Sequence, residues 1–178
     1  PIFIPHLGCP HQCVFCDQRA IAAPEAPAPS AISAVVRQAM PWAEGGQLAF
    51  YGGSFTAIPA EEQIAYLQAA QPFLQAGLVK SLRISTRPDA IDGSILERLQ
   101  RYGVRTVELG AQSMNDEVLR QSGRGHTAED VRRAAKRVKE AGFELVLQVM
   151  AALPGDSRAL CRQPAHHQPR VAPPGAAP

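Results

Sequence analysis

The sequence predicts an α/β fold in which parallel strands are joined by helical crossovers. Two observations carry this prediction: short apolar, β-rich runs alternate with amphipathic helical patterns, and the alternation repeats at short intervals through residues 1–157. The periodicity leaves open whether the sheet is doubly wound or curls into a barrel, because both folds need the same alternation. In either fold ligands bind beyond the carboxyl ends of the strands, so the residues directly after each strand are the candidate site residues.

Five runs are expected to form the strands because they are short, apolar and rich in β-branched or aromatic residues. They are Ile2–Ile4, Leu48–Tyr51, Leu82–Thr86, Val104–Leu109 and Leu145–Met150. Ala22–Pro29 is a run of alanines and prolines that can bury little surface, and we expect it to be a solvated loop.

The first two helices are predicted from apolar spacing and from proline. The first helix places four apolar residues on one face, namely Ile32, Val35, Val36 and Met40. The second is expected to begin at Pro59, a favoured first helical residue, and to end or kink at Pro72.

The third and fourth helices carry end signals at both termini. Asp92 is a typical N-cap, and Gly103 suits the left-handed residue that closes the third helix. The fourth helix begins after the cap residue Thr127 and stops at Gly142. Its basic side chains are interpreted as a solvated face rather than as an RNA-binding surface.

Length and composition indicate one globular domain: the chain has 178 residues, of which 46% are hydrophobic and 19% charged. A formal net charge of +2 does not by itself indicate a nucleic-acid partner. No apolar run reaches the roughly 20 residues of a membrane-spanning helix, and the first residues lack the layout of a secretory signal. We therefore expect a cytoplasmic protein without membrane contact.

Residues 158–178 differ in kind from the rest of the chain. They are rich in proline, contain the adjacent His166 and His167, and have no apolar periodicity. We expect a disordered tail after a core of residues 1–157. The change is abrupt and the chain opens on Pro1, so one hypothesis is that a frameshift or truncation replaced the rest of the domain.

The strongest chemical signal is a group of three cysteines directly after the first predicted strand, Cys9, Cys13 and Cys16. One loop can place these three thiolates on one metal centre, and closely spaced thiols in a chain without a secretion signal are more often metal or redox groups than disulfides. Three ligands for a four-iron cluster leave one iron open, which is the mark of a catalytic metal centre.

Two other interpretations of the cysteines stay open on spacing alone. The three thiolates could bind zinc with His6 or His11 as the fourth ligand, which would make the chain a zinc-binding module without catalysis. The thiols could also be free and buried, although packing alone poorly explains three cysteines in so short a segment.

The cysteine spacing, with Phe15 directly before the last cysteine, resembles the signature of the radical S-adenosylmethionine (radical SAM) superfamily. The resemblance continues in the segments after each predicted strand through residues 1–157. Within the superfamily it is most similar to the radical domain of the elongator catalytic subunit and to oxygen-independent coproporphyrinogen oxidase. It implies a partial parallel (β/α) barrel of the radical SAM type, incomplete at its C-terminal end, with five of six β/α units.

The resemblance also implies the activity and its cofactors. It implies an enzyme in which Cys9, Cys13 and Cys16 hold a 4Fe-4S cluster and S-adenosylmethionine (SAM) is cleaved reductively to a 5'-deoxyadenosyl radical. The implied partners are SAM, an electron donor such as flavodoxin or ferredoxin and, by similarity to elongator, tRNA. No catalytic acid or base is assigned, because hydrogen abstraction by a carbon radical does not require one.

Eight residues are expected from the resemblance to contact the cofactor. They are Phe15, Gly52, Gly53, Ser54, Ser85, Gln112, Arg124 and Gln148. Arg124 is expected to pair with the SAM carboxylate, because a guanidinium matches carboxylate geometry. Taken alone, the glycine pair would be interpreted as a tight turn and Arg124 as a solvated loop residue. His126 is interpreted as structural.

Two departures from the family pattern have physical consequences. Ala152 stands where the family has glycine, which is expected to narrow the space beside the cofactor. The sixth strand is expected to be missing, which predicts an exposed sheet edge and poor stability or solubility.

Overall fold

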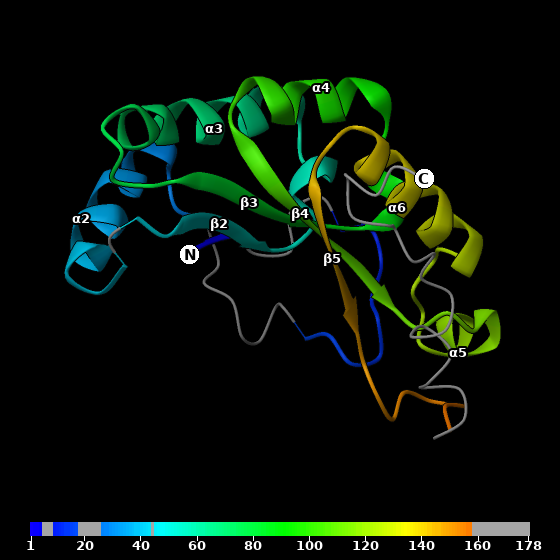
Figure 1. Ribbon diagram of the computed structural model, residues 1–178. Helices are drawn as coiled ribbons and strands as arrows, with labels where there is room; N and C mark the ends of the chain where they lie inside the picture. The colour runs from blue at the N-terminus through cyan, green and yellow to red at the C-terminus, as the bar shows by residue number, and fades with distance from the viewer. Residues whose placement is uncertain (5–8, 18–25, 44, 158–178) are drawn as a thin grey trace, which may run out of the picture.

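The computed structural model describes residues 1–4, 9–17, 26–43 and 45–157. In these residues it forms one parallel sheet with strand order β1-β2-β3-β4-β5 (Figure 1). The strands are β1 (Ile2–Ile4), β2 (Gln47–Gly52), β3 (Ser81–Thr86), β4 (Val104–Gln112) and β5 (Glu144–Val149). Every neighbouring pair is parallel, so the predicted α/β fold with helical crossovers is confirmed.

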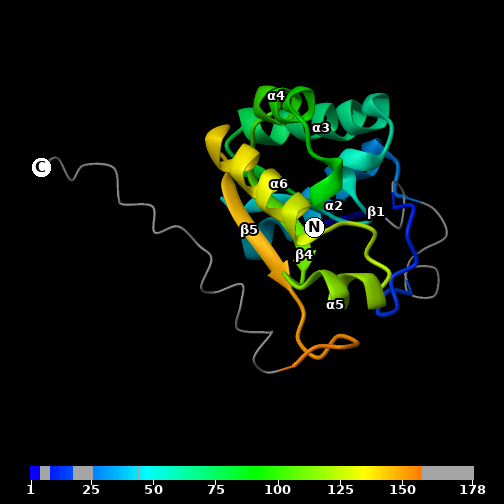
Figure 2. The same ribbon diagram turned by 90° about the vertical axis from the view of Figure 1, so that its right-hand side faces the viewer.

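Four of the described helices pack on one face of this sheet, and the short α5 (Asp116–Gln121) lies beyond the carboxyl ends of β4 and β5 (Figures 1 and 2). The four are α2 (Ile32–Ala43), α3 (Ala60–Gln75), α4 (Gly93–Arg101) and α6 (Ala128–Glu140). Single 3-10 turns precede α2 and follow β2 and β3, at Pro29–Ala31, Phe55–Ala57 and Pro88–Ala90. Successive side chains of a strand point to opposite faces of the sheet. Alternate strand residues therefore face the helices and form the core, while the residues between them face the other way.

The core lies between the sheet and the helices. Phe50 of β2 is fully buried and stacks on Phe55 with ring centroids 5.0 Å apart. Each described helix except the short α5 contributes to the same cluster, which includes Ile32, Leu67, Leu99 and Val138 against Ile84, Val107 and Leu109 of the sheet. Burial of these aliphatic and aromatic side chains supplies the main driving force for the fold.

The predicted strand and helix ends were largely right. Asp92 caps α4, its Oδ1 accepting a 2.8 Å hydrogen bond from the Ile95 amide. Thr127 and Asp130 form a capping box at the start of α6. The two closing glycines both adopt left-handed backbones, Gly103 with φ +78° and Gly142 with φ +82°.

The expected start of the second helix was wrong, and of the two outcomes expected at Pro72, an end or a kink, the end does not occur. Pro59 is the residue before α3 rather than its first helical residue, and Pro72 lies inside the helix, which continues to Gln75. Proline removes a single intrahelical hydrogen bond, whereas this helix buries Leu67 and Ala70 completely in the core. Tertiary packing therefore outweighs the local break signal.

Two of the segments singled out in the sequence lie partly or wholly outside the described residues. The predicted loop Ala22–Pro29 lies partly outside the described residues, and its last residue begins the 3-10 turn Pro29–Ala31. The predicted tail, residues 158–178, and the possible zinc ligand His6 lie outside the described residues altogether. Among the helices that the structure describes, none has the length and apolar character needed to cross a bilayer.

Candidate functional site

The carboxyl edge of the sheet gathers segments that are far apart in the sequence. The cysteine loop follows β1, the glycine pair ends β2, Arg87 follows β3, Gln112 ends β4, and Arg124 lies in the connection between α5 and α6. In a parallel α/β fold this edge is where ligands bind. These predicted site residues therefore share one edge of the sheet, and their binding of a cofactor stays a prediction.

The cysteine loop is docked on the connection between α5 and α6. The Val14 amide donates a 3.1 Å hydrogen bond to the Ser122 carbonyl, and Cys13 Sγ lies 3.7 Å from the Gly123 carbonyl oxygen. Cys13 is buried, Cys9 is half-buried and Cys16 is exposed. A turn links two of them, because the Cys16 amide donates to the Cys13 carbonyl at 2.9 Å.

The three thiols of the cysteine loop are not arranged around a common metal position in the structure. Within the described residues, no three side chains of the His, Cys, Asp or Glu types are close enough to hold a metal ion. The His11 ring lies over Gly125, so close that a Cβ built on that glycine would be 2.2 Å from the ring. The metal site on Cys9, Cys13 and Cys16 stays a prediction.

Arg124 is the residue that joins the cysteine loop to the sheet. Its guanidinium is buried, with Nη2 donating to the Gly110 carbonyl at 2.6 Å and Nη1 lying 3.5 Å from Cys13 Sγ. The same group lies over the Phe15 ring, 5.9 Å from its centroid. The interpretation of Arg124 as a solvated loop residue is thus wrong.

Gly110 makes room for this arrangement. A Cβ built on it would lie 3.1 Å from Gln112 Nε2 and 3.2 Å from Arg124 Nη2. Gln112 itself is buried and has a left-handed backbone with φ +64°, which is rare for a residue with a side chain. Such strain is held only where the surroundings fix it, and it is concentrated at functional sites.

The glycine pair allows β2 to end against β1. Gly52 has φ +114°, and a Cβ built on it would be 2.1 Å from the Ile4 carbonyl oxygen. The Gly53 amide donates to the same oxygen at 2.8 Å. Ser54 is buried, with its Oγ 2.8 Å from Thr86 Oγ1 and accepting from the Arg87 amide at 3.2 Å. These contacts establish a structural role, and cofactor contact stays a prediction.

The last two predicted contact residues lie on the strands themselves. Ser85 is half-buried on β3 and pairs in register with Glu108 of β4. Gln148 is exposed near the end of β5, and its Nε2 donates to Glu108 Oε1. Glu108 was not singled out from the sequence, since a lone glutamate in an apolar strand carries no motif.

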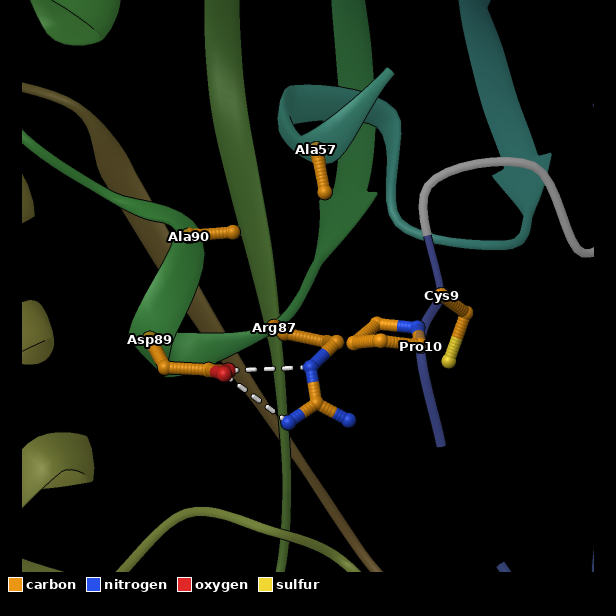
Figure 3. A pocket seen from close by; sticks show the side chains of 6 residues that line it. All are labelled: Cys9, Pro10, Ala57, Arg87, Asp89 and Ala90. Atoms are coloured by element: carbon orange, nitrogen blue, oxygen red, sulfur yellow. Dashed lines mark hydrogen bonds and ion pairs between the residues drawn. The ribbon is translucent and has the colours of Figure 1, made fainter. Parts of the chain in front are cut away.

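Arg87 is a further residue that sequence reasoning passed over. It lines a pocket of about 530 Å³ together with Cys9, Pro10, Ala57, Asp89 and Ala90 (Figure 3). Its Nε and Nη2 each donate to Asp89 at 2.9 Å, and Nη2 also donates to the Arg124 carbonyl at 2.9 Å. The signal available in the sequence was the pair of opposite charges around Pro88 at a strand end.

His126 is neutral at ordinary pH. Burial, and next the positive charge of Arg124, lower its pKa from 6.5 to about 4. Its Nε2 lies 3.2 Å from the Ala111 carbonyl oxygen, while its buried Nδ1 has no partner among the described residues. These contacts support the interpretation of His126 as structural.

Two buried guanidinium N–H groups, Arg87 Nη1 and Arg124 Nε, lack protein partners in the described residues, as do Ser122 Oγ and His126 Nδ1. An unpartnered buried N–H is costly and suits a ligand that accepts hydrogen bonds. Together with the thiols of the adjoining loop, this donor set fits an anionic cofactor assembly bound by sulfur.

Comparison with known proteins decides the family. The family model described as the radical SAM superfamily matches residues 3–160. The chain belongs to the radical SAM superfamily. The resemblance inferred from the cysteine spacing is confirmed.

The radical SAM chain is similar to several curated proteins over part of their length. It is 24% identical over 152 residues to the heme chaperone HemW of Lactococcus lactis, covering 84% of this chain and 40% of that protein. It is 35% identical over 77 residues to the tRNA uridine(34) acetyltransferase of Methanocaldococcus infernus, covering 43% and 14%. The chain thus spans well under two thirds of these relatives.

Solved structures show the same fold. The archaeal Elp3 of Methanocaldococcus infernus matches with a TM-score of 0.62 at 24% identity, over 74% of this chain and 35% of that one. Coproporphyrinogen III oxidase (HemN) from Escherichia coli, described as a radical SAM enzyme, matches with a TM-score of 0.61 at 18% identity, over 89% and 38%. The predicted partial barrel of radical SAM type is confirmed.

Proposed function

We propose that this radical SAM chain is an enzyme whose Cys9, Cys13 and Cys16 hold a 4Fe-4S cluster. When bound, the cluster supplies the electron that cleaves SAM reductively to a 5'-deoxyadenosyl radical. One observation carries the proposal: the cysteine loop is docked at the carboxyl edge of the sheet with Cys13 Sγ 3.5 Å from the buried guanidinium of Arg124. The other residues of the site are proposed to bind SAM and to orient it toward the cluster.

The side chains around the loop support binding of a zwitterionic cofactor. Arg124 offers its unpartnered Nε to a carboxylate, and a buried guanidinium binds such a group more strongly than an exposed one. At Gly52 and Gly53 the end of β2 has no side chain, so its backbone can approach the end of β1 and a bound cofactor closely. Phe15 lies against one side of the Arg124 guanidinium.

Four polar side chains line the rest of the proposed cofactor site. They are Ser54, Ser85, Gln112 and Gln148. The hydroxyl of Ser54 is already engaged by Thr86 and the Arg87 amide, so its contribution is to fix the end of β3. Gln148 is exposed at the end of β5, where it is available to the nucleoside.

The substrate and partners are proposed by analogy with the relatives. Similarity to an archaeal tRNA uridine(34) acetyltransferase supports a tRNA substrate. Reductive cleavage needs an external electron, for which a flavodoxin or ferredoxin is proposed. A cytoplasmic location accords with clustered thiols that must stay reduced.

Anaerobic reconstitution with iron and sulfide tests the proposal. We expect a brown protein that bleaches on reduction and that forms 5'-deoxyadenosine from SAM with dithionite as reductant. Cys13→Ala should lose both properties, while Cys161→Ala, which removes the cysteine outside the loop, should keep them. A colourless protein with one tetrahedral zinc on the loop, purified without air, would show a zinc-binding module instead.

A further inference from the structure

A chain of polar contacts crosses β3, β4 and β5 on the face of the sheet that turns away from the helices. Val107 and Leu109 of β4 belong to the core with the helices, so Glu108 between them faces the other way. β3 and β5 flank β4 on its two sides (Figure 1). This face carries Gln148, the residue proposed for the nucleoside end of the cofactor.

Glu108 is held from both sides. It is only 4% exposed although it is a carboxylate. From β3, Arg83 donates to Glu108 Oε2 through Nε at 3.0 Å and also through Nη2. From β5, Gln148 Nε2 donates to Glu108 Oε1. Both oxygens are therefore engaged, Oε2 by two N–H groups of the Arg83 guanidinium and Oε1 by the Gln148 amide, and these contacts from two strands fix the orientation of the carboxylate.

The carboxylate decides which way the Gln148 amide points. A carboxylate only accepts hydrogen bonds, so the NH₂ group of the amide must face it. The flipped amide would set two oxygen atoms against each other. The carbonyl oxygen of this exposed side chain is then the group that Gln148 can offer to a ligand, as an acceptor for a hydrogen-bond donor.

We infer that Glu108, supported by Arg83, is a positioning residue that presents the Gln148 carbonyl oxygen to a hydrogen-bond donor of the cofactor's nucleoside. The inference rests on the proposed function and deepens it. The donor is a ribose hydroxyl or the exocyclic amine of adenine. A site built in this way discriminates against a nucleoside that lacks the donor, because the Gln148 carbonyl oxygen, once covered by the bound cofactor, would then be left without a partner.

An exchange of the two side chains tests the pairing. SAM affinity is measured by calorimetry on the anaerobically reconstituted chain for Glu108→Gln, Gln148→Glu and the double variant. Each single exchange should weaken binding by about tenfold, the loss expected for one hydrogen bond to a charged group. The double exchange should recover most of the affinity, since the amide now at position 108 can donate to the carboxylate at position 148.

A second measurement tests the presented oxygen. Three SAM analogues each lack one donor: the 2'-hydroxyl, the 3'-hydroxyl or the adenine amine. In the wild-type chain one analogue should bind about tenfold more weakly than SAM. In Gln148→Leu, which has no acceptor, that analogue and SAM should bind equally. In Glu108→Gln, which no longer fixes the direction of the Gln148 amide, the discrimination between that analogue and SAM should also shrink, and a merely structural role of Glu108 would leave it unchanged.

The outcomes separate the inference from the proposed function. If the cluster-loaded wild-type chain does not bind SAM, both are overturned. If it binds SAM but the single exchanges bind as tightly, or the double exchange fails to recover, only the inference is overturned. Iron content and melting temperature, measured for every variant, show whether a weaker variant has lost its fold. Should a single variant fail to fold, the SAM affinity of the double exchange and the analogue binding of Gln148→Leu still test the inference.

Discussion

At Gly52 the backbone of β2 passes so close to β1 that no side chain fits between them. An added Cβ would meet the Ile4 carbonyl at 2.1 Å, and the φ of +114° is itself strained for any other residue. Gly52→Ala is expected to lower the free energy of unfolding by about 3 kcal/mol or more. Gly93→Ala is the matched control, because nothing lies within 4 Å of its Cβ and its φ is ordinary.

Urea unfolding measures both glycine variants. The control should change the free energy of unfolding by less than about 1 kcal/mol. Equal losses in the two variants would contradict the argument from close approach.

Ala152 has the backbone of a glycine. Its φ of +61° lies in the left-handed region, which costs a residue with a Cβ roughly 1–2 kcal/mol. Ala152→Gly should therefore raise the free energy of unfolding, by up to about 1 kcal/mol after the extra flexibility of the unfolded chain is subtracted. Ala151→Gly, at a neighbour without a positive φ, should lower it. Chemical denaturation of the two variants distinguishes a gain from a loss.

His126 makes stability depend on pH. Its pKa is lowered from 6.5 to about 4 in the folded chain, so protonation favours the unfolded chain. Its contribution to stability is complete above its ordinary pKa and is lost as the pH falls toward about 4. His126→Gln keeps a donor for the Ala111 carbonyl but does not titrate. The variant should lose less unfolding free energy than wild type between about pH 7 and pH 4, measured by urea unfolding; parallel losses would refute the assignment.

At the scale of the element, the cap of α6 is the clearest local device. Thr127 accepts from the Asp130 amide at 3.2 Å while Asp130 accepts from the Thr127 amide at 2.8 Å. Thr127→Ala should cost about 1 kcal/mol of unfolding free energy. Thr127→Ser keeps the hydroxyl and should stay within a few tenths of wild type. Circular dichroism during chemical denaturation measures both, and an equal cost for the two would argue against capping.

In α3 the helix continues past an internal proline, a residue that locally disfavours helix. Pro72 interrupts one backbone hydrogen bond, yet the helix runs on to Gln75. The Ala76 amide donates back to the Pro72 carbonyl at 3.0 Å, so the last turn closes normally after the proline. Burial of the preceding residues in the core compensates for the missing bond.

At the scale of the whole molecule, β5 is one of the two edge strands of the described sheet, with β1 at the other edge. Val149 is 54% exposed and Met150 is 38% exposed, which leaves apolar surface next to an open backbone edge. Such edges pair with other chains. Val149→Lys should reduce aggregation of the chain while changing unfolding free energy by no more than about 0.5 kcal/mol. Light scattering at matched concentrations measures the effect.

The control for Val149→Lys is the same substitution at an exposed apolar residue that lies outside the strands. Leu78→Lys changes a residue in the turn after α3 that is 36% exposed and does not belong to a strand. It should leave aggregation unchanged. An equal reduction by both substitutions would point to net charge rather than to the strand edge.

The sequence by itself determined the order of strands and helices, most of their ends and the family. These are local signals: apolar periodicity, cap residues three positions from their partners, and three cysteines in one loop. The six-residue α5 escaped prediction, because its signal is too short to separate from a loop.

Only the tertiary structure decided which side chains of the site meet. Arg124 lies against Cys13, a residue 111 positions away, and Glu108 meets Gln148 across two strands. Arg87, which follows β3, lines a pocket together with Cys9 of the loop after β1. Such partners are chosen by how loops from different strands converge at one edge of the sheet, and sequence spacing contains no record of that convergence.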